Sequence, residues 1–218
     1  MKFVDIHSHN YSNDKEIISI RNYILGIDSI RTNSPFSMGI HPWYLKVDIK
    51  ILEELIKQNQ NNPHWKALGE CGMDFSPENL QKFSQKKQEE VFIEQIKLAG
   101  KFRKPIIIHC VKCFDRLLKI KKENDNNQIW IVHGFSKNKI LARQLLNAGF
   151  YLSFGALIYK SKTNAEALRY TPVNQMFLET DEQVKYNIKE IYQFAAQVKN
   201  VSLQKITEPI FYNYSTLL

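Results

Sequence analysis

Two short segments of this 218-residue chain are apolar at every position, and they limit its fold more than any other feature. They are Ile106-Ile107-Ile108 and Ile129-Trp130-Ile131-Val132. Side chains alternate between the two faces of a strand, so a strand that is apolar throughout must be buried on both faces. Such strands belong to parallel sheets that helices cover. The sequence therefore predicts an α/β fold.

An apolar strand followed by a polar, helix-like segment recurs along the chain. We expect strands at residues 2–7, 16–23, 36–41, 66–70, 105–109, 128–133, 150–154 and 175–180. We expect helices at residues 48–59, 77–102, 114–122, 139–148 and 187–199. Eight strands that alternate with helices predict a compact (β/α)8 TIM barrel. Its first two βα units should be abbreviated, because the connections at 10–15 and 25–35 are too short for a crossover helix. An incomplete or distorted barrel of seven strands is the alternative.

Composition and charge limit the domain number, the partners and the cellular compartment that we expect for the chain. We find no linker or repeat, so we expect one domain over residues 1–218. The net charge of +8 favours polyanionic partners such as nucleic acid or phosphorylated substrates. Three cysteines, with no secretory signal and no apolar run of membrane-spanning length, predict a cytoplasmic protein without a membrane partner. We also expect a monomer.

Imidazole and carboxylate side chains gather where the predicted strands end. The histidines there are His7, His9, His41, His109 and His133, five of the six in the chain, and the acids are Glu70 and Asp181. In a parallel barrel the C-terminal ends of all strands lie on one rim, where barrel enzymes place their sites. A single histidine there is commonly structural, but burying so many ionisable groups is costly unless they coordinate something. The pattern therefore predicts a metal site, in which Asp5 behind the two first histidines can orient a ring nitrogen.

The number of ligands exceeds what one tetrahedral ion requires. It suits two adjacent divalent ions bridged by a carboxylate and a water or hydroxide, an arrangement used for phosphoester hydrolysis. A mixed imidazole and carboxylate shell fits Zn, Mn, Fe, Co or Ni better than Mg.

Six motifs in order along the chain point to one family. They are Asp5-Ile6-His7-Ser8-His9, Gly39-Ile40-His41-Pro42-Trp43, Gly69-Glu70-Cys71-Gly72-Met73-Asp74, Pro105-Ile106-Ile107-Ile108-His109, His133-Gly134-Phe135-Ser136 and Leu178-Glu179-Thr180-Asp181. This ordered set resembles the TatD-type metal-dependent deoxyribonucleases, which belong to the amidohydrolase-like barrels.

The resemblance implies a role for each ligand. It implies that His7, His9 and Asp181 bind one metal, that His109 and His133 bind the second, and that Glu70 bridges both. Asp181 would also take a proton from the attacking water as general base. His41 and Asp74 would lie near the substrate or support the ligands, and Glu179 would orient a ligand.

The chain departs from the family pattern in places where a substrate would be bound. Many members carry an arginine where this chain has Val111, with Lys112 beside it. A guanidinium grips a phosphate with two hydrogen bonds, whereas the Lys112 ammonium acts as a point charge. The loop after Asp181, residues 182–185, lacks the proline that many members have there.

Two further features follow the ligand motifs. Cys110-Val111-Lys112-Cys113 is a C-x-x-C, but no second ligand pair is spaced to complete a structural zinc site. The aromatic residues Trp43, Tyr44, Phe75 and Phe135 follow metal motifs, where either base stacking or packing would explain them.

The leading hypothesis is a hydrolase that cleaves phosphodiester bonds in DNA with two divalent ions, and the resemblance suggests trimming of strand ends. An alternative keeps the metal site and changes the substrate, because His7-Ser8-His9-Asn10 is also similar to the opening of PHP-type phosphomonoesterases. Esters or amides, including aminoacyl-tRNA, fit the same chemistry. A third alternative is a non-catalytic nucleic-acid-binding protein, which predicts salt-sensitive binding without turnover.

Overall fold

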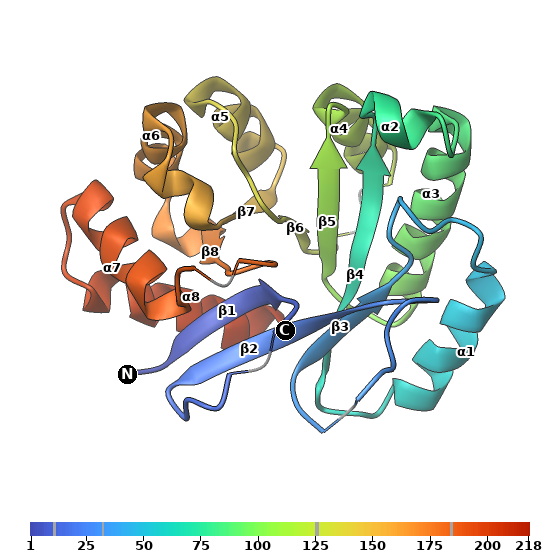
Figure 1. Cartoon of the computed structure of the whole chain (residues 1–218), viewed down its shortest axis with the longest axis horizontal. Coiled ribbons are helices and arrows are strands. Elements are labelled where there is room, and N and C mark those ends of the chain that lie inside the picture. The colour runs from blue at the N-terminus through green and yellow to red at the C-terminus, as the bar shows by residue number, and fades with distance from the viewer. Residues whose placement is uncertain (11, 32, 125–126, 184) are drawn as a thin grey trace. The chain divides into compact units, whose positions relative to one another are not determined.

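The computed structural model describes residues 1–10, 12–31, 33–124, 127–183 and 185–218 (Figure 1). The chain divides into two compact units. Unit 1 comprises Met1–Arg21 and Ile131–Leu218, and unit 2 comprises Asn22–Trp130. The boundaries between the units fall inside two strands. The expectation of one domain over the whole chain stays a prediction.

Strands and helices alternate along most of the chain. The strands are β1 (Phe3–Ser8), β2 (Ile17–Ile24), β3 (Phe36–Gly39), β4 (Trp65–Asp74), β5 (Ile106–Val111), β6 (Trp130–Val132), β7 (Phe150–Phe154) and β8 (Met176–Leu178). The helices are α1 (Ile49–Asn59), α2 (Pro77–Leu80), α3 (Gln85–Lys101), α4 (Phe114–Glu123), α5 (Lys139–Asn147), α6 (Lys162–Tyr170), α7 (Ile188–Lys199) and α8 (Gln204–Leu217). Two short 3₁₀ helices are η1 (Ala156–Tyr159) and η2 (Val173–Gln175). The strands follow one another in the sheet in chain order.

In unit 1, strand β1 lies between two parallel neighbours. On one side it pairs with β2, where Phe3 is opposite Ile17. On the other side a parallel bridge joins Ser8 to Asp181, just after β8, and β8 pairs in parallel with β7. The first strand of the sheet therefore meets the last, as the closure of a barrel requires.

A side chain supplies the hydrogen-bond partner of one backbone position of β1. The Tyr192 hydroxyl of α7 donates to the Val4 carbonyl (3.0 Å), and the Val4 N–H donates to the Tyr192 oxygen (3.2 Å). Val4 lies earlier in β1 than Ser8, where the bridge to the segment after β8 forms. Tyr192 is fully buried, and α7 packs on β1 (Figure 1).

In unit 2, the long strand β4 pairs in parallel with β3 and β5, and α3 packs along it (Figure 1). Gly69 and Gly72 let β4 approach its neighbour closely. Both have positive φ, and a Cβ on Gly72 would lie 2.1 Å from the His109 carbonyl oxygen. The two glycines of the Gly-Glu-Cys-Gly motif are therefore required by the packing of β4 on β5.

Several element predictions need correction. The helix expected over residues 77–102 is two helices, because Ser84 caps a new start at α3 by accepting a hydrogen bond from the Lys87 N–H. Helices α6 and α8 were not predicted. The expected seven-strand alternative is wrong, since the sheet has eight strands among the described residues. The described part of the connections β1–β2 and β2–β3 contains no helix, which confirms the abbreviated first units.

None of the described helices combines the length and the apolar composition that a membrane span requires.

Candidate metal centre

The backbone of unit 1 brings the end of β1 against the segment after β8. The Asp181 N–H donates to the His7 carbonyl (2.9 Å), and the His9 N–H donates to the Asp181 carbonyl (3.2 Å). Asp181 has a φ of 55°, in the left-handed region that Asp tolerates better than most residues. This clamp places both histidine side chains beside the Asp181 carboxylate.

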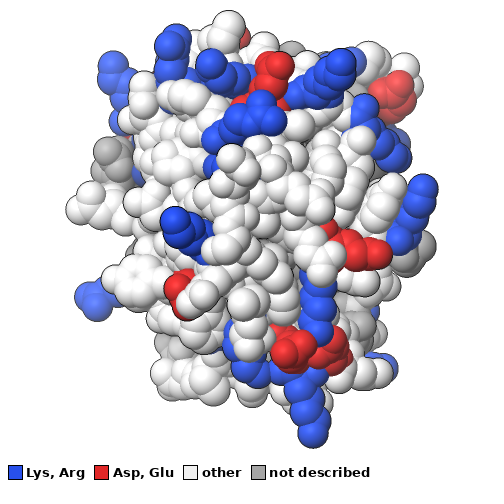
Figure 2. Space-filling view, turned by 90° about the vertical axis from the view of Figure 1, so that its left-hand side faces the viewer, with Lys and Arg blue, Asp and Glu red and all other residues white. Residues whose placement is uncertain are grey.

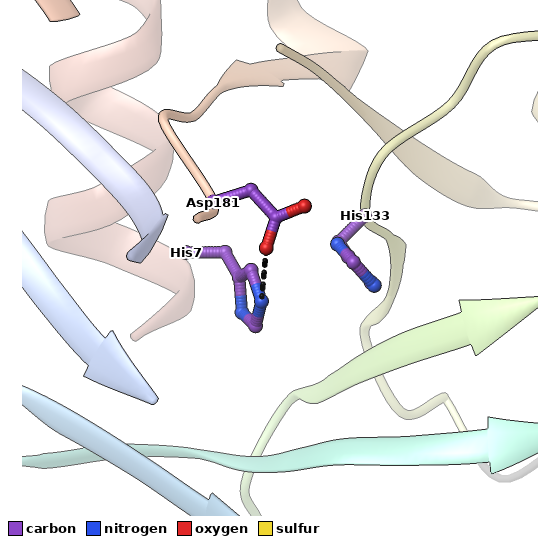
Figure 3. A group of neighbouring side chains, drawn as sticks. All are labelled: His7, His133 and Asp181. Atoms are coloured by element: carbon purple, nitrogen blue, oxygen red, sulfur yellow. Dashed lines mark ion pairs between the residues drawn. The ribbon is translucent and has the colours of Figure 1, made fainter. Parts of the chain in front are cut away.

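These unit 1 side chains have the spacing of metal ligands. The Asp181 Oδ1 lies 3.5 Å from the His7 Nε2 and 3.6 Å from the His9 Nε2. Two ligand atoms bound tetrahedrally at about 2.1 Å from one ion lie roughly 3.4 Å apart. Potential ligand atoms of His7, His133 and Asp181 all lie within 4.8 Å of one another, and Figure 3 shows their side chains pointing toward one another. The donor set and its spacing both fit a divalent ion.

The Asp5 carboxylate supports this group through Thr180. It accepts hydrogen bonds from the Thr180 N–H (2.9 Å) and hydroxyl (2.6 Å), and so holds the residue before Asp181. Burial raises the pKa of Asp5 to about 7, although the hydrogen bonds from Thr180 oppose the rise.

The carboxylate of Glu179 lies beside the third member of the group. Its Oε1 accepts from the Gly134 N–H (2.6 Å) and lies 3.4 Å from the His133 Nδ1. A carboxylate next to one ring nitrogen favours the tautomer that leaves the other nitrogen for a metal. The orienting role of Glu179 stays a prediction, for which this contact provides a partner.

Unit 2 contains a second group of potential ligands, with Glu70 within β4, His109 within β5 and His41 just after β3. The Glu70 Oε1 lies 2.8 Å from the His109 Nδ1 and 3.2 Å from the His41 Nε2. Potential ligand atoms of these three residues also lie within 4.8 Å of one another. Glu70 and His41 are buried.

Hydrogen bonds give the two histidines of unit 2 different roles. The Trp43 N–H donates to the His41 Nδ1 (3.1 Å), so a neutral His41 carries its proton on Nε2 and donates it toward Glu70. The His109 Nε2 lies 3.2 Å from the Asp74 Oδ2 and its Nδ1 lies 2.8 Å from the Glu70 Oε1, so both ring nitrogens face carboxylates. A ring nitrogen and a carboxylate oxygen 2.8 Å apart need a proton or a metal ion between them. Within this group, His109 and Glu70 therefore fit a metal better than His41 does.

Asp74 is held as an anion. Its Oδ2 also accepts from the Trp43 Nε1–H (2.7 Å), and its Oδ1 accepts from the Ser76 N–H (2.8 Å). Burial alone would raise the pKa of Asp74, but the hydrogen bonds from His109, Ser76 and Trp43 together hold it well below its ordinary value.

Three buried amide side chains of unit 2 support the group, and they were not among the residues predicted from the sequence. Asn22 accepts from the Glu70 N–H (2.7 Å) and donates to the Glu70 Oε2 (3.2 Å). Gln95 brackets the backbone just before His41 by accepting from the Ile40 N–H (2.8 Å) and donating to the Ile40 carbonyl (3.0 Å). Gln88 accepts from the Asp74 N–H (2.7 Å). A signal existed, because the two glutamines lie seven residues apart on the apolar face of α3.

The remaining predicted residues lie away from these contacts. Lys112 is exposed directly after β5, with a φ of 57°. The Sγ atoms of Cys110 and Cys113 lie 3.4 Å apart, and the Cys113 thiol also contacts the Met73 carbonyl. In the loop after Asp181, Val184 lies outside the described residues.

Comparison with known proteins shows the family. The model of the family described as TatD related DNase matches residues 6–218. An uncharacterized metal-dependent hydrolase of Buchnera aphidicola is 33% identical over 162 residues, which are 73% of this chain and 60% of the relative. The human deoxyribonuclease TATDN3 is 28% identical over 153 residues, 65% of this chain and 56% of the relative. The matches therefore span a little more than half the length of these two relatives.

Solved structures show the same fold. The TatD homologue YjjV of Escherichia coli K12 has a TM-score of 0.82, with 20% identity, over 99% of this chain and 97% of that one. A TatD family hydrolase of Entamoeba histolytica has the same TM-score with 18% identity, again over 99% and 97%. These likenesses confirm the predicted (β/α)8 barrel. The chain belongs to the TatD family of metal-dependent hydrolases.

Proposed function

We propose that this protein is a metal-dependent deoxyribonuclease that hydrolyses phosphodiester bonds. One observation carries the proposal more than any other. In unit 1 the Asp181 Oδ1 is 3.5 and 3.6 Å from two imidazole nitrogens, too far for strong hydrogen bonds and close to the ligand spacing around one tetrahedral ion. The name of the human relative supports DNA as the substrate.

We assign the ligands as the family resemblance implies. In this proposal His7, His9 and Asp181 would hold one divalent ion, His109 and His133 would hold a second, and Glu70 would serve both. Zn, Mn, Fe, Co or Ni suits this mixed shell better than Mg. When bound, the ions lower the pKa of a water and stabilise charge on the phosphate oxygens.

The protein side chains then position the ligands and move the proton. Asp181, which lies beside two imidazoles, takes the proton of the attacking water as general base. Glu179 lies beside the His133 Nδ1 and Asp74 beside the His109 Nε2, so each carboxylate would orient its histidine and leave the other ring nitrogen for an ion. His41 donates to the Glu70 carboxylate and fixes its direction.

Surface charge supports a polyanionic substrate only weakly. The net charge is +8. On the face drawn in Figure 2, lysine and arginine side chains are spread widely, with acidic side chains among them. Such a distribution attracts DNA diffusely and does not select its sequence. A cytoplasmic location and a monomeric state stay predictions.

Hydrolysis of a labelled single-stranded oligonucleotide tests the proposal. We expect cleavage by protein loaded with Mn or Zn, loss of cleavage with EDTA, and recovery when metal is restored. Glu70→Gln should lose at least ~100-fold in rate, since it removes a ligand charge at the reacting centre. Glu90→Gln, an exposed acid of α3, is the matched control and should keep the activity. Cleavage that survives EDTA, or equal rates in both variants, would contradict the proposal. Turnover of phosphomonoesters or esters without cleavage of DNA would favour the alternative substrates.

A further inference from the structure

A pocket of about 460 Å³ lies in unit 2, beside the group that contains Glu70 and His109. We call it the Trp43 pocket. Its lining includes Ile27, Trp43, Tyr44, Lys46, Lys82 and Phe83. Trp43 and Ile27 are 46% and 57% exposed, which is unusual for such large apolar side chains. The metal ligands proposed above do not line it.

Trp43 connects the pocket to the candidate metal ligands. Its indole Nε1–H donates to Asp74 and its backbone N–H donates to His41. Both the side chain and the backbone of Trp43 are therefore held in place. Its ring centroid lies 5.0 Å from that of His41 and 6.0 Å from that of His109. The Trp43 ring that lines the pocket is therefore a direct neighbour of the His109 imidazole.

The lining combines an aromatic wall with positive charge. Trp43, Tyr44 and Phe83 supply aromatic surface, and the two charged side chains among the lining residues, Lys46 and Lys82, are both cations. The two lysines come from different segments, one before α1 and one between α2 and α3. A flat apolar group attached to an anion matches this combination. A volume of a few hundred Å³ is the size of a small-ligand site.

We propose that the Trp43 pocket binds the base of a terminal nucleotide of single-stranded DNA. The base stacks on the Trp43 indole, and Lys46 and Lys82 contact phosphates beside it. Stacking on an aromatic side chain tolerates every base, so the pocket recognises a nucleotide end without reading sequence. This inference rests on the proposed function, because it assigns part of the substrate of that site.

Binding to metal-free protein tests the pocket separately from catalysis. The probe is a fluorescein-labelled oligothymidine of five nucleotides, titrated in EDTA at low salt. A second probe has the same length but lacks the base on its terminal nucleotide. Two pocket variants, Ile27→Ser and Lys82→Ala, are compared with Ile51→Ser and Lys86→Ala. The controls change an exposed isoleucine of α1 and an exposed lysine of α3, both outside the lining.

The two pocket variants should respond differently to the two probes. Ile27→Ser should weaken binding of the complete probe about fivefold, through lost apolar contact, and leave binding of the abasic probe unchanged. Lys82→Ala should weaken binding of both probes and reduce the slope of log K against log salt by about 0.7. Ile51→Ser should bind both probes with the affinity of the wild type. Lys86→Ala should leave the slope of log K against log salt unchanged.

The outcomes separate this inference from the proposed function. Wild-type protein that binds both probes equally, or neither, would overturn the pocket assignment, as would equal affinities in Ile27→Ser and Ile51→Ser. Metal-dependent cleavage with an unchanged KM in Lys82→Ala would overturn the pocket and leave the nuclease standing. Probe binding that depends on the pocket, in a protein that cleaves no DNA with any metal, would support the pocket and overturn the proposed reaction.

Discussion

Replacing Asn22 by alanine should destabilise the protein and weaken its affinity for metal together. In the wild type the buried Asn22 amide accepts from the Glu70 N–H at 2.7 Å and donates to the Glu70 Oε2 at 3.2 Å. Leaving the buried N–H without its acceptor costs roughly 1–3 kcal/mol, and a hydrogen bond to a charged group contributes roughly 1.5–3 kcal/mol. The sum, reduced by local relaxation, is about 2–5 kcal/mol of unfolding free energy.

The assay has two parts, both with a matched control. Urea unfolding of metal-free protein gives the stability change, and titration with Mn or Zn gives the metal affinity. Loss of a residue that holds a ligand typically lowers metal affinity about 10- to 100-fold. Asn59→Ala removes a half-buried amide of α1 that donates to the Leu55 carbonyl, and it should cost about 1 kcal/mol or less without changing metal affinity. If Asn22→Ala is no less stable than Asn59→Ala and binds metal equally well, the supporting role assigned to Asn22 is wrong.

Three other predictions concern the frame around the site. Tyr192→Phe leaves the N–H and carbonyl of Val4 without their hydroxyl partner and should cost about 2–4 kcal/mol in urea unfolding, whereas Tyr212→Phe, at a 67% exposed position, should cost under about 0.5 kcal/mol. Gly72→Ala places a Cβ 2.1 Å from a backbone carbonyl at a φ of 138°, so we expect a loss of at least about 3 kcal/mol or no folded protein; a stable variant would contradict the close strand packing. Burial lowers the pKa of Lys199 from 10.5 to about 8, so the unfolded chain binds more protons between these values. Stability should therefore rise with pH there relative to Lys199→Met, and parallel pH profiles would refute this.

Residue types and strand ends were sufficient to predict the fold class and the groups of side chains that could bind metal. Segments that are apolar on both faces, such as residues 106–108, have few alternatives to a covered parallel strand. Elements with a weaker pattern were missed. Helix α6 has few apolar residues, and Pro209 lies inside α8, so periodicity did not indicate either helix. The cap at Ser84 divided a segment whose apolar pattern continued across the break.

The supporting residues of the site were harder to predict because their roles depend on partners distant in sequence. Asn22 contacts a residue 48 positions away, and Gln95 contacts one 55 positions away. The sequence shows that an amide side chain is present, but it does not show which residue that amide contacts in the folded chain. The role of His41 was left open for a different reason, since a local hydrogen bond from the Trp43 N–H, which the sequence does not show, decides which of its nitrogens carries the proton.

The metal content of the purified protein tests the central claim most directly. After metal loading and removal of excess ions, elemental analysis should find about two divalent ions per chain in the wild type and in Glu90→Gln. Glu70→Gln and Asp181→Asn should each retain fewer, while circular dichroism shows that they remain folded. A folded wild-type protein that retains no metal, or variants that retain as much as the wild type, would contradict the metal centre from which the proposed function follows.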